Sequence, residues 1–487
     1  AEGTGVTVRG MSYVRSELNG RDSFSANGGR SLSFEDVPPE LMAGVDVYKN
    51  PSAEQIEGAI GGLVNLRTAL PFDFKGAKGA VSVQESRSQL RGKNSPSLSG
   101  LVSNRWKTGF GEFGALLDLA RSRIDTRSDG MQISPYIART DAVVGDTSGA
   151  KRWISGGDSW TTNNFERERD GLYGALQWKK YALSSHLTYF RSKYDMSTTE
   201  AALSASANPA TIMLDPGAVF DDRGVLLAGT IRAPKDPGVG IGTDSRSTGR
   251  TSDTRDVAWN LQWRATDQWV FSGDLQHTRA TTDGYDNTVG MGAYAPKEGV
   301  DFRSSPPKLT FDDADRAFLA NPNNYYWGFT QEHRDEAVAA QNAARLDAKF
   351  TFDSPVLNDL RFGVRFTNRS AETRATHGNN QWHEITQPWA VGSDGWQPFS
   401  KLAYLSDPRF AGNASAVPFN NFFGGKVATP PSIVVPNLSL SQGTPPPGFT
   451  QLHDMVKVLC NGTCSGDALW NYALFGDPES RNLQHEK

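Results

Sequence analysis

The strongest constraint in this sequence is a set of segments in which apolar and polar side chains alternate with a period of two. In one of them the apolar positions are Val257, Trp259, Leu261 and Trp263. Because successive side chains of a β-strand point to opposite faces, the pattern predicts strands. It recurs along the chain, and we expect roughly nine strands, at 80–90, 98–106, 112–123, 171–179, 183–194, 256–264, 269–278, 345–352 and 360–373.

The connections between these segments differ sharply in length. Links at 179–181, 265–268 and 353–359 are short, whereas the three at 125–169, 198–252 and 282–340 are long, polar and rich in Gly, Pro and Asn. Short turns on one side and long loops on the other are typical of outer-membrane barrels. Aromatic residues beside the short turns suit an interfacial girdle: Trp178, Tyr181, Trp263, Trp269 and Phe352. The alternative is a half-buried sheet in a soluble sandwich or propeller, with these rings in its core.

Composition excludes several classes of protein. The 50 Lys+Arg and 54 Asp+Glu give a net charge of −4, so a nucleic-acid partner is not expected. No run approaches the ~18 apolar residues of a membrane-spanning helix. A spanning β-strand needs only ~10 residues of alternating character, so a membrane barrel stays compatible with this hydropathy.

The strand count and the last quarter of the chain point to a fragment. Single-chain bacterial barrels have an even number of strands, and an open sheet leaves unpaired edges in lipid. Residues 377–487 contain no alternating segment of spanning length and resemble a long loop. We therefore expect the remaining barrel strands to lie on residues outside this sequence.

The N-terminal part of the chain resembles a known protein family. Residues 34–51 have the sequence FEDVPPELMAGVDVYKNP, followed by EGAIGGLVNLRT at 57–68 and PFD at 71–73. This closely resembles the C-terminal half of the plug domain of TonB-dependent outer-membrane receptors. It is most similar to the Xanthomonas- and Caulobacter-type subgroup, in which Asn19-Gly20-Arg21 is also familiar. The resemblance covers 5–73, and its motif positions are Val47, Lys49, Pro51, Gly58, Gly61, Gly62, Asn65, Arg67 and Thr68.

The resemblance implies an all-β fold: a partial transmembrane antiparallel β-barrel with a small α+β plug domain inside its lumen. The expected domains are the C-terminal part of the plug at 1–75, about nine barrel strands with long extracellular loops at 76–376, and an extracellular loop region at 377–487. The plug motif itself predicts strands at 45–48 and 63–67, joined through glycines that permit tight turns.

The implied function is active import of a scarce nutrient across the bacterial outer membrane, driven through TonB and its inner-membrane proton motor. Such a protein is not an enzyme and needs no cofactor or metal. Its expected partners are TonB, outer-membrane lipid and lipopolysaccharide, a small-molecule substrate, and a surface lipoprotein or the remainder of the chain. The subgroup is associated with carbohydrates, which favours an oligosaccharide. The alternatives are a siderophore-iron receptor, or a secreted all-β carbohydrate-binding protein.

Two sets of residues are candidates for substrate binding. The first is a polar loop expected after a strand at 6–9, at the plug apex: Tyr13, Arg15, Glu17, Asn19 and Arg21. For Arg15, Arg21 and Arg67, ion pairing of plug to barrel is an equally good interpretation. The second set is aromatic and suits stacking on sugars: Tyr325, Tyr326, Trp327, Trp382, Trp389 and Trp396. Packing of the loops onto each other is the competing explanation.

Cys460 and Cys464, the only cysteines, are four residues apart. In an oxidising compartment we expect them to form a local disulfide.

Overall fold

The computed structural model describes residues 5–26, 32–50, 52–206, 210–234, 238–376, 381–385, 402–427, 432–444, 446, 448–460 and 481–486. Strands dominate this part of the chain. Pro51, Trp389, Trp396 and Cys464 lie outside it, and of Trp382 and Cys460 only the backbone is described. Among the described residues, no helix is both long and apolar enough to cross a membrane.

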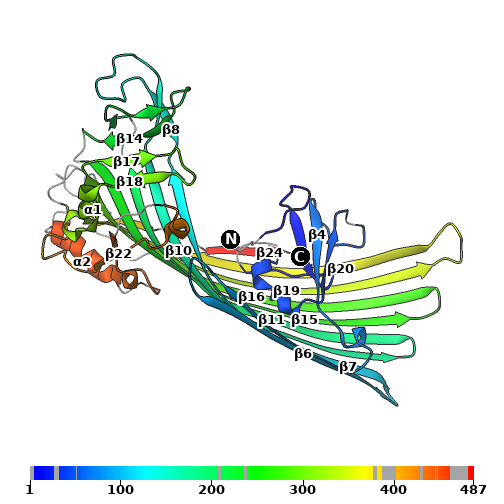
Figure 1. Cartoon of the computed structure of the whole chain (residues 1–487). Helices are drawn as coiled ribbons and strands as arrows, with labels where there is room; N and C mark the ends of the chain where they lie inside the picture. Colours follow the sequence, from blue (N-terminus) through cyan, green and yellow to red (C-terminus); the bar gives the residue numbers. More distant parts are fainter. Residues whose placement is uncertain are drawn as a thin grey trace.

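One eleven-stranded sheet, which we call the wall, forms most of the molecule (Figure 1). Its strands follow one another as an antiparallel meander from β5 to β20, with β24 beyond β20 and β21 beside β19. Their bounds are β5 Lys78–Arg87, β6 Asn94–Thr108, β7 Gly111–Ile133, β10 Gly157–Lys180, β11 Leu183–Ser206, β15 Val239–Arg264, β16 Trp269–Ala295, β19 Tyr326–Thr351, β20 Asp359–Ala375, β21 Gln381–Glu384 and β24 Arg481–Glu486. All nine expected strands are confirmed, in the expected order.

The strands are much longer than the sequence predicted, and the expected long loops are wrong over much of their length. β15 begins at Val239 and β16 continues to Ala295, and the two stay paired in one register along their full length. The extensions are rich in Ser, Thr, Gly and charged residues, so hydropathy does not show their alternation. Backbone pairing does not require apolar side chains, and it continues as long as neighbouring strands stay in register.

The plug is a four-stranded sheet held against the wall. Its strands are β1 Val14–Leu18, β2 Arg21–Asp22, β3 Gly44–Tyr48 and β4 Gly62–Arg67, in the order β2-β1-β4-β3. β3 and β4 pair antiparallel, so the two predicted plug strands are confirmed. Plug side chains such as Leu18 and Leu41 share a core with Leu116 and Tyr173 of the wall.

Small elements gather at the far end of the wall, opposite the short turns (Figure 1). They are β8 Tyr136–Arg139, β9 Arg152–Ser155, β12 Met213–Leu214, β13 Val219–Phe220, β14 Leu226–Arg232, β17 Glu298–Asp301, β18 Lys308–Thr310, α1 Asp313–Ala320, β22 Ala414–Val417, β23 Ile433–Pro436 and α2 Gly448–Cys460. Together with the adjoining ends of the wall strands they form the largest apolar core among the described residues. We call them the cap.

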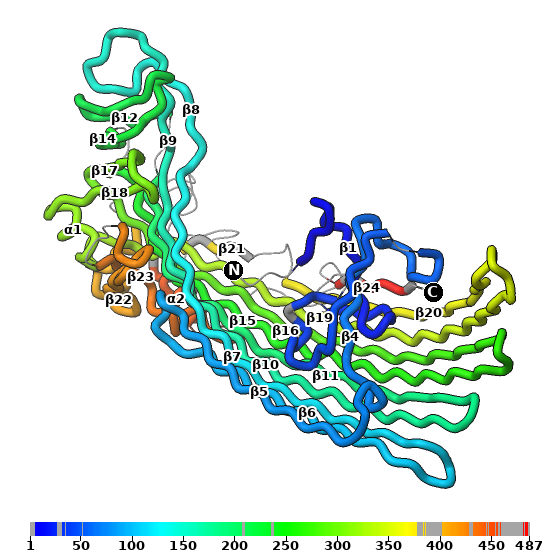
Figure 2. The backbone as a smooth tube through the Cα atoms, turned by 45° about the vertical axis from the view of Figure 1, so that its right-hand side comes forward, coloured from blue at the N-terminus to red at the C-terminus, as the bar shows by residue number. Residues whose placement is uncertain are grey.

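The plug and the cap lie on opposite faces of the wall (Figure 2). On β15, Ser252 contacts the plug through Asp36, whereas Thr243 and Ser245 donate hydrogen bonds to the β23 carbonyls of Val434 and Pro436. Even and odd positions of an unbroken strand face opposite ways. We call the half of the wall near the short turns the lower wall and the half near the cap the upper wall. The plug covers one face of the lower wall, which we call the inner face. The cap covers the opposite, outer face of the upper wall.

Close packing of plug on wall depends on glycine at Gly171. A Cβ there would lie 2.7 Å from Pro38 Cγ and 2.9 Å from Leu41 Cδ1. We predict that Gly171→Leu lowers the free energy of unfolding by roughly 1–3 kcal/mol, as overpacking does. Urea denaturation in detergent measures it. Gly174→Leu is the matched control, because that position is three residues along β10 with no atom closer than 3.9 Å. Equal losses in both variants would contradict tight docking at Gly171.

Candidate functional site

The inner face of the wall continues upward beyond the plug, and this exposed stretch is the best candidate for a substrate-binding surface. On β15 the inner positions above Ser252 are Arg250, Thr248, Arg246 and Asp244. On β16 they include Asp286, and Glu200 of β11 lies opposite Arg246. We call this stretch the upper inner wall. Its side chains are half-buried, unlike the cap-covered positions between them on the same strands.

Charged groups of both signs are arranged along this surface. Arg246 makes a bidentate ion pair with Asp286, with Nε 2.7 Å from Oδ1. Closer to the plug, Arg250 and His333 approach Asp335 at 3.7 and 3.8 Å. Mixed carboxylate and guanidinium groups offer both acceptors and donors, which is what a polyhydroxylated ligand requires.

Asp244 is the most perturbed carboxyl of the upper inner wall. It lies eight residues along β15 from Ser252, the position that contacts the plug. Burial, reinforced by the nearby carboxylate of Glu200 and only partly offset by Arg246, raises the pKa of Asp244 to about 7. Near neutral pH its protonated form can donate a hydrogen bond, which an ordinary aspartate cannot.

A tyrosine cluster stands at the top of this surface. The rings of Tyr294 and Tyr326 stack with centroids 5.8 Å apart, and Tyr404 meets Tyr326 edge-on at 5.5 Å. Tyr326 covers Gly292, an inner-face position of β16, so the cluster faces the same side as the plug. Tyr294 and Tyr404 are only partly buried.

Tyr325 and Trp327 are placed differently from their neighbour Tyr326. Both are fully buried in the cap core, where Trp327 Nε1 donates to the carbonyl of Phe410 and Tyr325 Oη to that of Leu319. For these two residues the structure agrees with the loop-packing explanation, because neither ring has a face open to a ligand.

Most of the segment from Tyr13 to Arg21 is strand: Val14–Leu18 form β1, Asn19 and Gly20 form a turn, and Arg21 begins β2. The expectation of a loop is wrong, because β1 is an inner strand of the plug sheet, paired with both β4 and β2. Tyr13 is 74% exposed, whereas Glu17 is buried at 3%, and burial raises the pKa of its carboxyl. Asn19 turns the chain at a φ of 55° and binds Thr68 through its amide. These residues therefore do not share one surface.

The arginines of the plug divide between its own sheet and the wall. Arg21 forms a bidentate pair with Asp274 of β16, with contacts of 2.8 and 2.7 Å, so it joins plug to barrel wall. Arg15 pairs within the plug, 2.9 Å from Asp22. Arg67 also pairs within the plug, 2.8 Å from Asp46. The plug-to-wall interpretation thus fits Arg21 but not Arg15 or Arg67.

Asp22 is the charge centre of the contact between plug and wall. Besides Arg15 it binds Arg369 of β20 at 2.7 Å, and Arg365 lies 3.9 Å away. Its backbone carbonyl accepts from Gln276 of β16. A second contact joins Glu54 to Arg361 at 2.7 Å. Movement of the plug along the wall would have to break these pairs.

The plug motif residues serve the plug sheet itself. Gly58 and Gly62 have φ of 104° and 148°, where other residues are strained, and Gly61 passes within contact of the backbone of Tyr13. Asn65 accepts a hydrogen bond from the backbone of Gly20. Val47 is exposed, and Lys49 follows the end of β3.

Sequence reasoning missed the upper inner wall. Its residues fall in the stretches expected to be loops: Glu200, Asp244, Arg246, Arg250, Asp286, Tyr294, His333 and Asp335. The signal was available as alternation of Gly, Ser and Thr with charged residues, for example across 239–250, but a hydropathy pattern does not register it. Within the described part of the chain, no group of three or more His, Cys, Asp or Glu is placed to hold a metal ion.

The sequence matches no protein-family model and no curated protein. Solved structures similar to this chain include the outer-membrane transporter YddB from Escherichia coli, at 9% identity and a TM-score of 0.24, covering 76% of this chain and 68% of that one. The siderophore receptor PiuA from Acinetobacter baumannii is 11% identical with a TM-score of 0.21, covering 87% and 63%. A mutant of the ferric enterobactin receptor PfeA from Pseudomonas aeruginosa has 10% identity and a TM-score of 0.21, covering 78% and 74%. Identities and TM-scores this low do not determine the function of this chain.

The raised pKa of Asp244 predicts that the free energy of unfolding depends on pH. Its pKa is higher in the folded than in the unfolded chain, so between about pH 4 and 7 the folded state binds more protons. The free energy of unfolding should therefore fall as pH rises through this window, by at most about 1.4 kcal/mol per unit. Asp244→Asn should flatten this slope, as measured by denaturation at pH 5, 6, 7 and 8. Glu200→Gln should move the window to lower pH. An unchanged slope in Asp244→Asn would refute the assignment.

Proposed function

We propose that this chain is part of a TonB-dependent transporter that imports a nutrient across the bacterial outer membrane. The observation that carries the proposal is the division of the wall into two faces. Its inner face holds a plug through ion pairs, and the outer face of the same strands exposes a continuous apolar surface. No covalent chemistry is required of it.

The outer apolar surface has the character of a lipid contact. Contiguous exposed apolar patches above a few hundred Å² are rare on monomeric soluble proteins. Here exposed apolar side chains follow one another across neighbouring strands, including Leu117, Leu119, Leu176, Leu187, Val257, Trp259, Leu275, Leu346, Phe362, Val364 and Phe366. We call this surface the apolar band. Lipid is the occupant that would cover it on every strand at once.

The limits of the apolar band match a membrane. Below it lie aromatic residues beside the short turns, with Tyr181 90% exposed and Trp263 49% exposed. Above it lies a belt of charged outward side chains, the charged belt: Arg121, Asp170, Arg191, Arg255 and Arg279. On β10, Trp178 and Asp170 are eight residues apart, which is roughly 20 Å of membrane depth for a tilted strand. This is close to the ~25 Å apolar band of outer-membrane barrels.

Transport would follow the inner face. A substrate would bind the upper inner wall above the plug, and pulling by TonB would break the contacts of Arg21 and Asp22 with the wall. The wall is an open sheet in the described residues, with β5 at one edge. Such edges must be paired in lipid, and we infer that further strands complete the barrel. We also propose that the domain boundaries lie at residues 75 and 376. We propose further that the chain belongs to the Xanthomonas- and Caulobacter-type subgroup, and that lipopolysaccharide and a surface lipoprotein are among its partners.

For the substrate we propose an oligosaccharide. Tyrosine rings above a row of carboxylates and guanidinium groups would provide a stacking surface and hydrogen bonds to hydroxyl groups. Ferric siderophores are the alternative substrate class. Trp382, Trp389 and Trp396 stay predictions for the same role. A variant carrying Trp382→Ala, Trp389→Ala and Trp396→Ala that binds normally would remove them.

Membrane insertion has a direct test. The purified chain should be monodisperse in a neutral detergent and should aggregate when the detergent is removed, because the apolar band is then exposed to water. Size-exclusion chromatography with light scattering measures both states. A chain that is monodisperse without detergent would refute the membrane proposal and favour a secreted all-β carbohydrate-binding protein.

Substrate class has a second test on the upper inner wall. We predict that Tyr294→Ala and Glu200→Gln each weaken binding of the preferred oligosaccharide by about tenfold, since each removes a contact to the ligand. Isothermal titration calorimetry against neutral oligosaccharides and ferric chelates measures this. Tyr285→Ala is the matched control, because Tyr285 lies on the same strand but contacts Ser247 on the opposite face. Binding of a ferric chelate alone, sensitive to the same variants, would instead assign the siderophore class.

A further inference from the structure

Two carboxyl groups are buried against each other where the cap packs on the upper wall. Asp158 of β10 is 4% exposed, and Glu298 of β17 is 7% exposed. The two side chains are hydrogen-bonded to each other. We call them the carboxyl pair. Because an unpaired carboxylate is costly to bury, the pair needs a source of neutralisation.

Strand register places Asp158 on the face of the wall that the cap covers. Its partner on β11 is Ala205, and the partner of Ala205 on β15 is Ile241. Ala205 and Ile241 line a small cavity together with Glu298 of β17 and Leu319 of α1. The carboxyl pair therefore joins a wall strand to a cap strand inside the largest apolar core.

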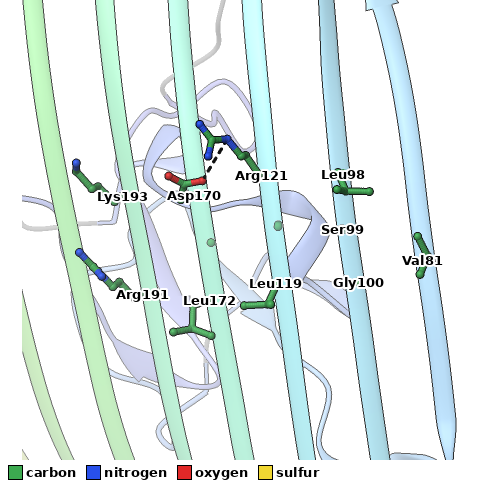
Figure 3. A pocket seen from close by; sticks show the side chains of 12 residues that line it. Val81, Leu98, Ser99, Gly100, Leu119, Arg121, Asp170, Leu172, Arg191 and Lys193 are labelled. Atoms are coloured by element: carbon green, nitrogen blue, oxygen red, sulfur yellow. Dashed lines mark ion pairs between the residues drawn. The ribbon is translucent and has the colours of Figure 1, made fainter.

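The carboxyl pair differs from the carboxylates on the rest of the wall because it lacks a cation. Figure 3 shows Asp170, lower on the same strand β10, paired with Arg121 at 3.7 Å. Within the described part of the chain, Asp158 and Glu298 have no such ion pair.

Other titratable groups near the carboxyl pair do not neutralise it. Lys297 lines the same cavity, but it is bound by Asp312 and lies 3.9 Å from Asp315. Tyr136 of β8 faces Asp158, and burial together with that carboxyl raises the pKa of its hydroxyl. Neither group supplies the missing positive charge.

The cavity is too small for a hydrated metal ion. Its volume is about 20 Å³, which holds about one water molecule, whereas Ca²⁺ takes six to eight oxygen ligands. One oxygen of each carboxyl, Oδ1 of Asp158 and Oε1 of Glu298, has no hydrogen-bond partner. A single O–H···O contact between two carboxyl groups leaves such a pattern, so a proton fits the site better than a metal.

We propose that the carboxyl pair binds one shared proton and that this proton holds the cap on the upper wall. With the proton present, the contact is a charge-assisted hydrogen bond between a carboxylic acid and a carboxylate, which is a strong class of hydrogen bond. Without it, two carboxylates repel each other in an apolar core. The cap then separates from the wall at this contact. The inference goes beyond the proposed transport function and requires neither lipid nor substrate.

The direction of the pH effect follows from the folded chain holding its protons tightly. Burial raises the pKa of Asp158 to about 6, and burial together with Asp158 raises the pKa of Glu298 well above its usual value. Exposed carboxyls have pKa values near 4. Above that pH the docked cap keeps a proton that the separated cap has lost, so docking should weaken as pH rises.

Hydrogen–deuterium exchange of the full chain tests the proposal. The chain is kept in dodecyl maltoside with EDTA at pH 6.5, 7.5 and 8.5, and mass spectrometry gives protection factors corrected for the intrinsic pH dependence of exchange. We expect the protection of β17 and α1 to fall about tenfold per pH unit, because opening releases the shared proton. Protection of β4 in the plug should not fall in this way. Protection of β17 that is constant with pH would overturn the proposal.

Variants of the carboxyl pair identify the group that titrates. Glu298→Gln places an amide donor beside Asp158 at every pH, so protection of β17 should no longer depend on pH. Asp158→Asn combined with Glu298→Gln should give the same flat profile, and circular dichroism confirms that the β-sheet is kept. Asp301→Asn is the matched control, because Asp301 lies on the same strand, is bound to Arg303 and stays ionised over this range. It should keep the wild-type slope. A wild-type slope in Glu298→Gln would overturn the proposal.

Calcium chloride distinguishes a proton from a metal ion. If calcium slows exchange of β17 in the wild type but not in Glu298→Gln, a metal ion holds the pair and the proposal fails. Equal exchange with and without calcium supports the shared proton. Because the measurement compares cap and plug within one chain, its result is independent of the membrane and substrate proposals.

Discussion

The unbroken antiparallel ladder of the wall is the constraint on which the other features depend. Because register runs without interruption along pairs such as β11 with β15, each side chain is assigned to a face by its position number alone. The same strands therefore lie in different surroundings in the lower and upper halves of the wall. In the lower half the plug covers the inner face and the outer face is apolar. In the upper half the cap covers the outer face and the inner face is polar and half-exposed.

The contact between plug and wall combines packing with charge. Apolar groups such as Leu41 fit against glycine positions of the wall, while Arg21 and Asp22 form ion pairs with side chains from several strands. Partly buried ion pairs contribute little net stability but are costly to break singly. Such a contact specifies one position of the plug against the wall.

The candidate site shows where sequence reasoning succeeded and where it stopped. The nine strands and their order were predictable, since Trp259 and Leu346 alternate with polar neighbours. The upper extensions were not, because residues such as Gly242 and Thr248 carry no hydropathy signal. Tyr325, Tyr326 and Trp327 are consecutive, yet the strand pairing changes register at Gly290 and Met291, and only Tyr326 joins the inner tyrosine cluster. No pattern in the sequence distinguishes the three.

By itself the sequence determined the antiparallel meander, the short turns with their aromatic neighbours and the two strands of the plug motif, because these depend on local alternation and on turn residues. Only the tertiary structure decided which face the cap covers, which arginines join plug to wall, and that Asp244, Glu200 and Tyr294 line one surface. Those outcomes depend on contacts between residues tens to hundreds of positions apart, as between Asp22 and Arg369. Pairing register and packing determine such contacts, and local side-chain preference does not encode them.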